Sequence, residues 1–249
     1  MTKHKAGLVS VSFRPYSVDE IVRATKESGL TCIEWGSDVH APCNDKERLC
    51  EIVRLQEENG IYCSSYGTYF SLGVNDISEL SEYINAAKIL GTNILRLWCG
   101  NKNCNEYSDE EKEYLFGQAK IAAELAEKRN VYMCMECHNN SYTETLEGAL
   151  ELMKAVDSEH FGMYWQPNQN ISFEKNVQYA KEISKYVKCV HVFYWKDREK
   201  HPLHEAVQMW KEYLVCFESQ TNFLLEFMPD DRLESLKNES AALFEILGE

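Results

Sequence analysis

The stretch Val131-Tyr132-Met133-Cys134-Met135-Glu136-Cys137-His138-Asn139 joins an apolar run to a polar end. Successive side chains of a strand point to opposite faces, so Glu136 shares a face with Cys134 and His138, whereas the two methionines share the other face. One face is then apolar, and the other ends in a carboxylate and an imidazole. This pattern indicates a strand that packs against helices on one side and opens on a polar site at its carboxyl end.

Seven other runs with strand character recur at intervals of about 25 to 35 residues, each followed by a longer segment with helical periodicity. They are residues 8–13, 31–35, 61–66, 93–98, 161–165, 187–193 and 222–227. The eight alternations fill the 249 residues without a linker or a shift in composition. The sequence therefore predicts an α/β fold with one domain, a single (β/α)8 TIM barrel over residues 1–249.

The segments between these runs carry residues that begin and end helices. Ser17-Val18-Asp19-Glu20 has the capping-box pattern. Asp109-Glu110-Glu111 places acidic side chains at the start of a long helix, where the helix dipole favours them. Gly29, Gly60 and Gly91 stand where left-handed residues are expected to end helices. These signals support the alternation of strand and helix.

A doubly wound open sheet is the main alternative to the barrel. Such a sheet normally has a glycine-rich dinucleotide-binding turn after its first strand. The segment Phe13-Arg14-Pro15-Tyr16-Ser17, which follows the first run, contains no glycine. The barrel is therefore the favoured interpretation.

The composition excludes several classes of protein. With 44% hydrophobic and 27% charged residues, the chain is typical of globular proteins, which excludes a disordered or collagen-like chain. Its 26 basic and 40 acidic residues give a net charge of −14. An acidic surface repels phosphate backbones and anionic lipids, so we expect neither a nucleic-acid partner nor a membrane partner. No apolar stretch reaches the roughly 18 residues of a membrane span.

The ten cysteines do not indicate a disulfide framework. The N-terminal segment lacks the apolar region and the cleavage site of a signal peptide, and several cysteines lie inside strand-like runs, where a reduced cysteine acts as a small buried hydrophobe. We therefore expect a reduced, cytoplasmic protein. Cys134-Met135-Glu136-Cys137 has no second CxxC partner and opens no helix, so we interpret its spacing as coincidence.

In a (β/α)8 barrel the active site lies at the carboxyl ends of the strands, and these ends are polar here. The polar or aromatic residues at or just after them include Glu34, Asp38, His40, Arg96, Trp98, Glu136, His138, Gln166, Asn168, Gln169, Asn170, His191, Trp195, Arg198 and Glu226.

Two further strands repeat the alternation of the opening stretch. An inward His191 leaves its two valine neighbours outside the barrel. An inward Glu226 leaves Phe223, Leu225 and Phe227 to pack toward the helices. Together with the glutamate of the opening stretch, three strands therefore aim one ligand each into the same mouth.

Two carboxylates and one imidazole match the ligands of divalent ions such as manganese, cobalt, zinc or magnesium. We expect ligand atoms of Glu136, His191 and Glu226 within about 5 Å of a common point, with Gln166 as the fourth candidate. A strand-end glutamate often forms a salt bridge, and a single histidine is often a hydrogen-bonded core residue. Inward carboxylates without a partner are costly to bury, which favours a metal site over these structural interpretations.

Two other polar residues have structural interpretations. Arg96 either contacts substrate oxygens or forms a buried ion pair with a strand-end acid such as Glu34, and the two interpretations have equal weight. His40 is interpreted as a structural residue of its loop.

Six segments resemble those of the xylose isomerase-like TIM-barrel superfamily, the sugar phosphate isomerase/epimerase family, which also contains inosose dehydratases and abasic-site endonucleases. They are Ile33–Pro42, Arg96–Gly100, Met135–Asn139, Tyr164–Asn168, Val190–Phe193 and Leu224–Phe227. Each motif is short, but they occur in this order at successive strand ends and span nearly the whole chain. The resemblance is more specific for the fold than for the reaction.

The resemblance implies a metal ion held by Glu136, Gln166, His191 and Glu226. Gln166 departs from the family pattern, in which an acid is usual at this position. An amide oxygen can ligate, but the protein ligands then contribute a charge of −2 rather than −3, so we expect weaker divalent binding that depends more on a chelating substrate.

The resemblance also implies proton transfer next to a carbonyl through an enediolate. Glu136 and Glu226 would be the catalytic acid/base pair, and the ion would polarise the substrate oxygens. His138 and Arg96 would hold oxygens that develop charge, and Asn168 and Gln169 would contact substrate hydroxyls. The expected substrate-binding residues are Glu34, Arg96, Trp98, His138, Asn168, Gln169, Trp195 and Arg198.

Large aromatic residues are expected at or near the rim of this site, where they would face a sugar ring or cap the core. They are Trp35, Tyr66, Trp98, Trp165, Phe193 and Trp195. A basic cluster in the loop after the seventh strand either binds a phosphate or is solvated, and we favour a solvated loop. It consists of Lys196, Arg198, Lys200 and His201.

The sequence thus predicts a divalent-metal-dependent sugar isomerase or epimerase whose partner is a small sugar or polyol, and it leaves homo-oligomerisation open. One alternative is metal-dependent dehydration of a keto-polyol. Another is a non-catalytic sugar-binding barrel that has lost its metal. A three-zinc DNA-repair nuclease is disfavoured, because it needs more histidine ligands than these seven histidines supply, and a basic face.

Overall fold

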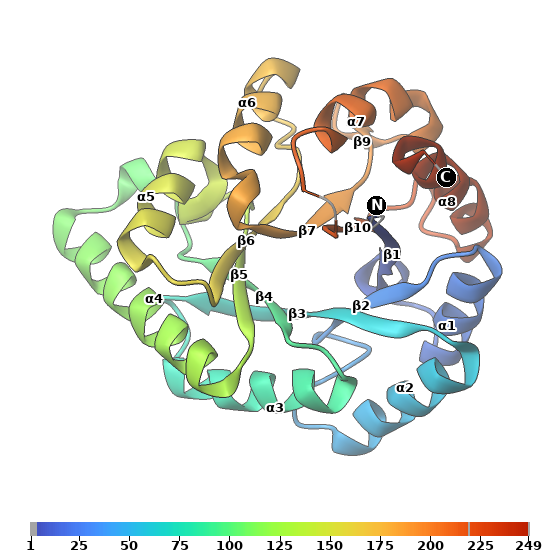
Figure 1. The fold of residues 1–249 in the computed structure, drawn as a ribbon, viewed down its shortest axis with the longest axis horizontal. Coiled ribbons are helices and arrows are strands. Elements are labelled where there is room, and N and C mark those ends of the chain that lie inside the picture. The colour runs from blue at the N-terminus through green and yellow to red at the C-terminus, as the bar shows by residue number, and fades with distance from the viewer. Residues whose placement is uncertain (1–3, 219, 249) are drawn as a thin grey trace.

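The computed structural model describes residues 4–218 and 220–248. Eight parallel strands close a barrel in the order β1-β10-β7-β6-β5-β4-β3-β2 (Figure 1). The strands are β1 (Lys5–Val9), β2 (Cys32–Gly36), β3 (Tyr62–Leu72), β4 (Ile94–Cys99), β5 (Tyr132–Glu136), β6 (Phe161–Trp165), β7 (Val187–Val192) and β10 (Asn222–Leu225). The expectation of a (β/α)8 barrel is confirmed.

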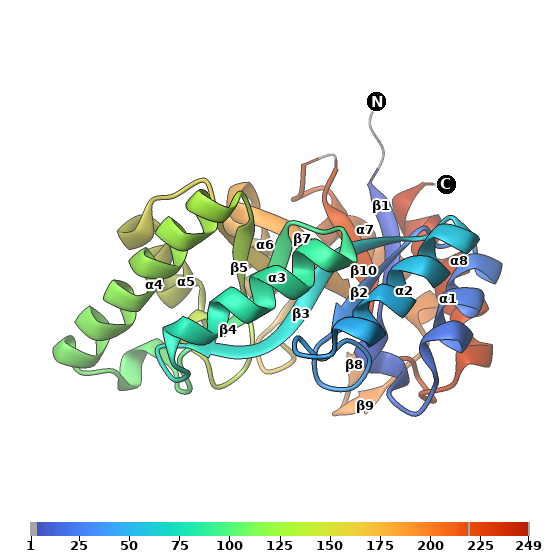
Figure 2. The same ribbon diagram turned by 90° about the horizontal axis from the view of Figure 1, so that it is seen from below.

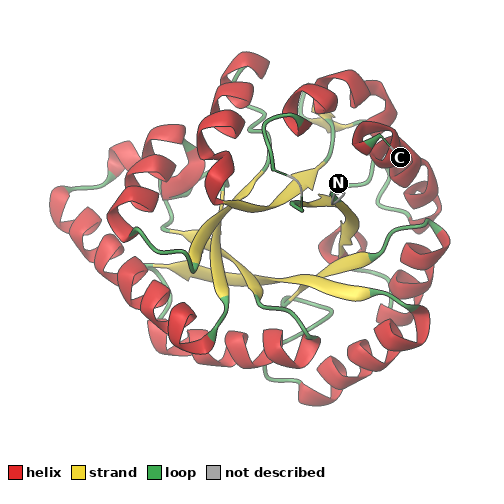
Figure 3. Ribbon diagram, in the orientation of Figure 1, coloured by secondary structure: helices red, strands yellow, loops and turns green. Residues whose placement is uncertain are grey.

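Helices surround the barrel on all sides (Figure 3). They are α1 (Val18–Glu27), α2 (Lys46–Asn59), α3 (Leu80–Leu90), α4 (Asp109–Arg129), α5 (Leu146–Val156), α6 (Phe173–Ile183), α7 (Val207–Leu214) and α8 (Leu236–Leu247). The capping box of Ser17 and Glu20 is present, and Gly60 and Gly91 end α2 and α3 in the left-handed conformation. The expected helix ends are therefore confirmed.

The first expected strand was too long. Strand β1 ends at Val9, and Ser10–Phe13 forms a 3-10 helix. The Ser10 hydroxyl accepts a hydrogen bond from the backbone N–H of Gly36 at 2.9 Å. A side chain thus replaces a ladder bond, and the chain leaves the sheet early.

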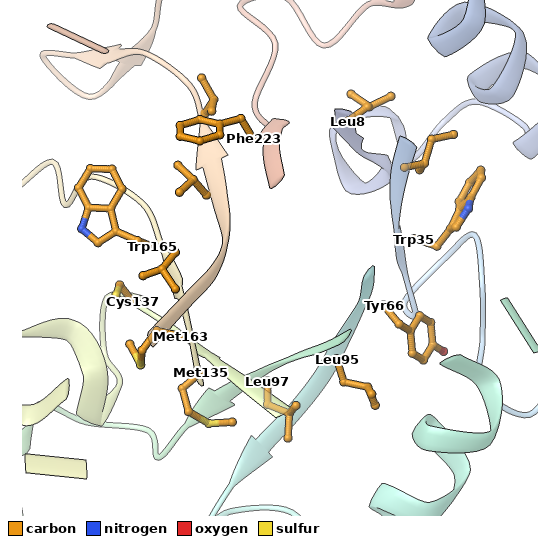
Figure 4. Close-up of a cluster of buried hydrophobic side chains, with 14 of the residues drawn as sticks. Leu8, Trp35, Tyr66, Leu95, Leu97, Met135, Cys137, Met163, Trp165 and Phe223 are labelled. Atoms are coloured by element: carbon orange, nitrogen blue, oxygen red, sulfur yellow. The ribbon is translucent and has the colours of Figure 1, made fainter. Parts of the chain in front are cut away.

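The barrel strands separate two apolar layers. Outward side chains pack toward the helices, as Figure 4 shows for Leu8, Leu97 and Met135. Inward side chains fill the barrel centre, and they include Val9, Cys32, Cys134, Tyr164, Cys189 and Leu224. The expected alternation of β5, with Cys134 inward and the methionines outward, is confirmed.

Three of the six expected rim aromatics belong to the outer layer instead. The indole N–H of Trp35 donates to Gln56 at 2.7 Å, and the Tyr66 hydroxyl donates to a backbone carbonyl at 2.6 Å. Trp165 packs edge-on against Tyr213, with ring centroids 5.0 Å apart. Figure 4 shows these three aromatic side chains pointing away from the barrel centre. Their placement at the rim was wrong, because a residue next to an inward side chain points outward.

A short antiparallel hairpin that the sequence did not indicate follows β7. It consists of β8 (Trp195–Lys196) and β9 (Glu199–Lys200), joined by two residues with positive φ, Asp197 and Arg198. Figure 2 places the hairpin at the end of the barrel opposite to the start of β1. It therefore lies at the carboxyl ends of the strands.

All ten cysteines are free thiols. Within the described part of the chain, none of the helices combines the length and the apolar character that crossing a membrane requires.

Candidate metal centre and active site

Three buried side chains from three strands converge at the carboxyl end of the barrel. They are Glu136 at the end of β5, His191 in β7 and Glu226 directly after β10. One ligand atom from each lies within 4.8 Å of the other two. Nδ1 of His191 lies 3.3 Å from Oε1 of Glu136 and 3.3 Å from Oε2 of Glu226. These distances leave a common point within reach of all three groups.

Ligand atoms of this cluster lack hydrogen-bond partners. Nδ1 of His191 and Oε2 of Glu226 are buried polar atoms without a hydrogen bond in the structure. Oε1 of Gln166, which lines the same cavity as Glu136 and Glu226, is another such atom. The contacts of Nδ1 with the two carboxylates are close, but they are not directed hydrogen bonds. Buried polar atoms without partners are costly. A cation bound between these oxygen and nitrogen atoms would satisfy them, so the donor set fits a divalent ion.

A third carboxylate, that of Glu34, orients the histidine from the side opposite to Glu136 and Glu226. Nε2 of His191 lies 3.5 Å from Oε2 of Glu34, and both side chains are fully buried. If Nε2 carries the proton, Nδ1 presents its lone pair to the other two carboxylates. A carboxylate on the second nitrogen is the usual way in which a metal-binding histidine is held.

Arg96 on β4 links two of the acids. Its Nε donates to Oε1 of Glu34 at 3.1 Å, and its Nη1 donates to Oε2 of Glu136. The indole N–H of Trp98 donates to the same oxygen of Glu136 at 2.6 Å. One oxygen of Glu136 is thus fully engaged, and Oε1 is left for a ligand.

The charges of this cluster do not balance without a cation. Glu34, Glu136 and Glu226 contribute three negative charges and Arg96 one positive charge, all of them buried. Burial would lower the pKa of His191, but the carboxylates of Glu226 and Glu34 raise it well above its usual value. Burial would also raise the pKa of Glu136, but the charge of Arg96 and the contact with His191 lower it. With a neutral histidine the excess is two negative charges, which one divalent ion would offset.

The cluster opens into a cavity of about 340 Å³. Nine of the residues that the sequence analysis assigned to the site line it: Arg96, Trp98, Glu136, His138, Gln166, Asn168, Gln169, Trp195 and Glu226. Gln166 donates its amide N–H to the backbone carbonyl of Cys137 at 3.2 Å, which fixes its side chain. The ring of His138 lies 5.0 Å from that of Trp98, and its Nδ1 contacts a backbone carbonyl at 2.7 Å.

Two expected substrate-binding residues lie elsewhere. Glu34 is fully buried and does not line the cavity, because Arg96, Ser65 and His191 surround its carboxylate. Arg198 lies exposed in the turn of the β8–β9 hairpin, away from the cavity lining. Glu34 therefore positions other side chains, and the ion pair with Arg96 that the sequence analysis considered is present.

The cavity wall also contains residues that the sequence did not indicate as part of the site, among them Arg14, Tyr69 and Phe227. Arg14 is held by Asp38, with Nε 2.6 Å from Oδ2, and by the Tyr69 hydroxyl. Phe227 was expected to pack toward the helices. Its φ of 55° breaks the strand alternation and turns the side chain to the cavity.

His40 has the structural role that was expected. Its Nδ1 contacts the Ser10 hydroxyl at 3.2 Å, and its Nε2 contacts the backbone carbonyl of Tyr16 at 3.1 Å. The imidazole thus ties the loop after β2 to the segment after β1, and burial lowers its pKa.

Comparison with known proteins gives similarities of different extent. The 3-dehydroshikimate dehydratase of Bacillus anthracis is 33% identical over 66 residues, which are 26% of this chain and only 24% of that protein. The apo structure of the 3-keto-D-glucoside 4-epimerase of E. coli has a TM-score of 0.72 at 14% identity, over 99% of this chain and 100% of that chain. The structure of the IOLI protein with a bound zinc atom has a TM-score of 0.78 at 14% identity, over 98% of each chain.

A family model extends over most of the chain. The model described as xylose isomerase-like TIM barrel matches residues 22–236. This range includes all the strands that carry the buried cluster. The chain therefore belongs to the xylose isomerase-like TIM barrel family.

Proposed function

We propose that this chain is a divalent-metal-dependent sugar isomerase or epimerase that transfers a proton next to a carbonyl through an enediolate. An isomerase, an epimerase or a dehydratase of sugar-like substrates fits the family. The more specific proposal of metal-dependent proton transfer rests on one observation. Glu136, His191 and Glu226 converge, and the cluster has buried ligand atoms without a hydrogen-bond partner.

In this proposal Glu136, Gln166, His191 and Glu226 hold the ion. All four stand at or next to the carboxyl end of a barrel strand, and Oε1 of Gln166 is a buried acceptor without a partner. When bound, a divalent ion polarises a substrate carbonyl and lowers the energy of the charge that develops on its oxygen. Manganese, cobalt, zinc and magnesium are all compatible with this mixed set of oxygen and nitrogen donors.

The two glutamates differ in their surroundings. Arg96 and Trp98 both donate to Oε2 of Glu136, which holds that carboxylate in its charged form. Oε2 of Glu226 has no hydrogen bond. Glu226 is thus the better placed member of the proposed acid/base pair to remove the proton from the substrate carbon.

Other cavity residues would position the substrate. Trp98 and His138 lie against each other on one wall, where they present ring edges and faces to a sugar. Asn168 and Gln169 line the same cavity and offer amide groups to hydroxyls. The remaining N–H groups of Arg96 stabilise charge on an oxygen near Glu136.

Dehydration of a keto-polyol is the second candidate function. The partial similarity to a 3-dehydroshikimate dehydratase favours it. The first step is the same proton removal, but the resulting enolate then expels a hydroxyl from the neighbouring carbon. In the second step a general acid must protonate the hydroxyl so that it leaves as water, and His138 is a candidate for this acid because it lines the cavity.

A solvent-exchange assay tests the proposed function. The protein with manganese is incubated in deuterium oxide with a panel of ketoses, and the products are analysed by NMR and mass spectrometry. The product of an isomerase or epimerase contains solvent deuterium next to the carbonyl, and apart from this deuterium it has the same mass as the substrate. Loss of water identifies a dehydratase. No exchange with any ketose, together with no binding of manganese in excess, indicates a barrel without metal-dependent catalysis.

A further inference from the structure

A second, smaller cavity adjoins the active site. We name it the annex; its volume is about 150 Å³. It lies between the segment after β6, the end of β7 with the hairpin, and helices α6 and α7. Its wall residues outside the active-site cavity include Ile171, Phe173, Tyr194, Met209 and Tyr213.

No charged side chain lines the annex in the described part of the chain. Its wall consists of aromatic and aliphatic side chains with three amides. The main cavity differs, because it is lined by two arginines, two glutamates and a histidine. The annex therefore suits an uncharged group with an apolar face and does not suit a phosphate or a carboxylate.

The two cavities share one wall. Five residues line both cavities: Pro167, Asn168, Gln169, Phe193 and Trp195. The two cavities are thus at most one side chain apart. A substituent on a sugar in the main cavity would enter the annex by extending past the edge of this wall. The main cavity alone is at the lower end of small-molecule sites, which are about 300 to 1,000 Å³ in volume.

The shared wall is held in place before any ligand binds. The buried amide of Asn176 on α6 accepts the backbone N–H of Asn168 at 2.8 Å and donates to its carbonyl at 2.9 Å. Trp195 is held by pairing within the hairpin and by edge-on packing against Phe227 at 5.6 Å. A preformed wall costs little to order, so it can contribute to affinity and selectivity.

We propose that the annex binds an uncharged substituent that the sugar carries through a glycosidic oxygen. The preferred substrate is then a keto-sugar glycoside rather than a free or phosphorylated monosaccharide. The substituent is an aryl group or a second sugar ring, since both have an apolar face that packs on aromatic side chains. This inference rests on the proposed function of the main cavity.

Binding of a matched ligand series tests the annex. The manganese-loaded protein is titrated calorimetrically with three 3-keto-glucosides, which carry a methyl, a phenyl or a glucosyl substituent. Fructose 6-phosphate is titrated in the same way as the charged probe. We expect the phenyl compound, the glucosyl compound or both to bind about tenfold more tightly than the methyl compound, because only they bury apolar surface in the annex. Comparison of the phenyl and glucosyl compounds identifies which substituent is preferred.

Two variants assign any such preference to the annex. Met209→Trp fills it from α7, and Ile171→Trp fills it from the loop after β6. We expect either variant that folds to bind the methyl compound as the natural protein does and to lose the tenfold preference. Equal binding of all three glucosides, tightest binding of fructose 6-phosphate, or a preference that survives both variants overturns the proposal. If the glucosides bind but show no solvent exchange, the proposed reaction is refuted. The comparison of affinities still tests the proposal for the annex in that case.

Discussion

Glu34 and Arg96 form a buried ion pair behind the candidate metal centre, with Oε1 of Glu34 3.1 Å from Nε of Arg96. Their side chains are 0% and 4% exposed. Arg96 also donates to Glu136, and Glu34 faces Nε2 of His191. The pair thus holds two of the expected metal ligands, so a disturbance of the pair should be measurable at the metal.

Substitution of Gly67 disturbs this pair without removing a charge. A Cβ atom at position 67 would lie 2.7 Å from Oε1 of Glu34 and 3.0 Å from Nη2 of Arg96. We expect Gly67→Ala to destabilise the fold by about 1 to 3 kcal/mol, as overpacking does, and to weaken manganese binding. Denaturant unfolding and calorimetric titration measure the two effects.

Gly117 provides the matched control for that variant. It lies inside α4, and a Cβ atom there would have no neighbour within 4 Å. Gly117→Ala should stabilise the helix by up to about 1 kcal/mol and leave manganese binding unchanged. Unchanged manganese affinity in a folded Gly67→Ala protein would show that the ion pair does not hold the ligands.

Manganese affinity should rise with pH. The carboxylates around His191 raise its pKa in the metal-free protein, but a ligand imidazole must be neutral. Below the raised pKa each bound ion displaces one proton, so affinity increases by about tenfold per pH unit. Calorimetry in buffers of different ionisation enthalpy counts the released proton. Binding without proton release would mean that His191 is already neutral.

The same group makes the metal-free protein less stable as pH rises. A histidine whose pKa is raised by folding stabilises the fold below its unfolded pKa, and this contribution is lost as the pH rises through the folded pKa. His191 is such a group. Unfolding of the metal-free protein at several pH values above about 6.5, with and without manganese, should show a decrease that the metal reverses.

Glu226→Gln should affect both the metal and the reaction. It removes a charged ligand, which weakens manganese binding, and it removes the group proposed to take the proton, which should lower solvent exchange by a factor of about 100 or more. Exchange is measured at saturating manganese, so that the two effects are separated. A variant that still exchanges the substrate proton at the natural rate removes Glu226 from the catalytic pair.

Strand alternation made much of this site predictable. Glu136, His191 and Glu226 each stand among apolar residues at a strand end, and a period of two residues places all three inside the barrel. The same rule, applied to Trp35 and Trp165, would have placed them outward, where the structure has them. The outward orientation of these two side chains was therefore predictable from the sequence, and their assignment to the rim was inconsistent with strand alternation.

Other parts of the site depend on contacts that no local pattern encodes. Glu34 meets His191 across 157 positions of the sequence, and Arg14 meets Asp38 across 24. Phe227 reaches the cavity because of a left-handed backbone conformation. Loop conformations and pairings between distant strands arise from the closure of the barrel, so they became visible only in the folded chain.

Gln166→Asp should strengthen divalent binding if Gln166 is a ligand. Its Oε1 is buried without a hydrogen bond, and an aspartate adds a third charged ligand at the same strand end, which favours a divalent ion. We expect the manganese dissociation constant to fall by about tenfold, as measured by calorimetry. Asn168→Asp is the matched control, because it adds the same charge to the cavity wall at a position that is not an expected ligand. Equal gains in the two variants would indicate a general effect of charge, and no gain in Gln166→Asp would exclude Gln166 from the metal shell. A gain in Gln166→Asp alone would assign the fourth ligand to this position.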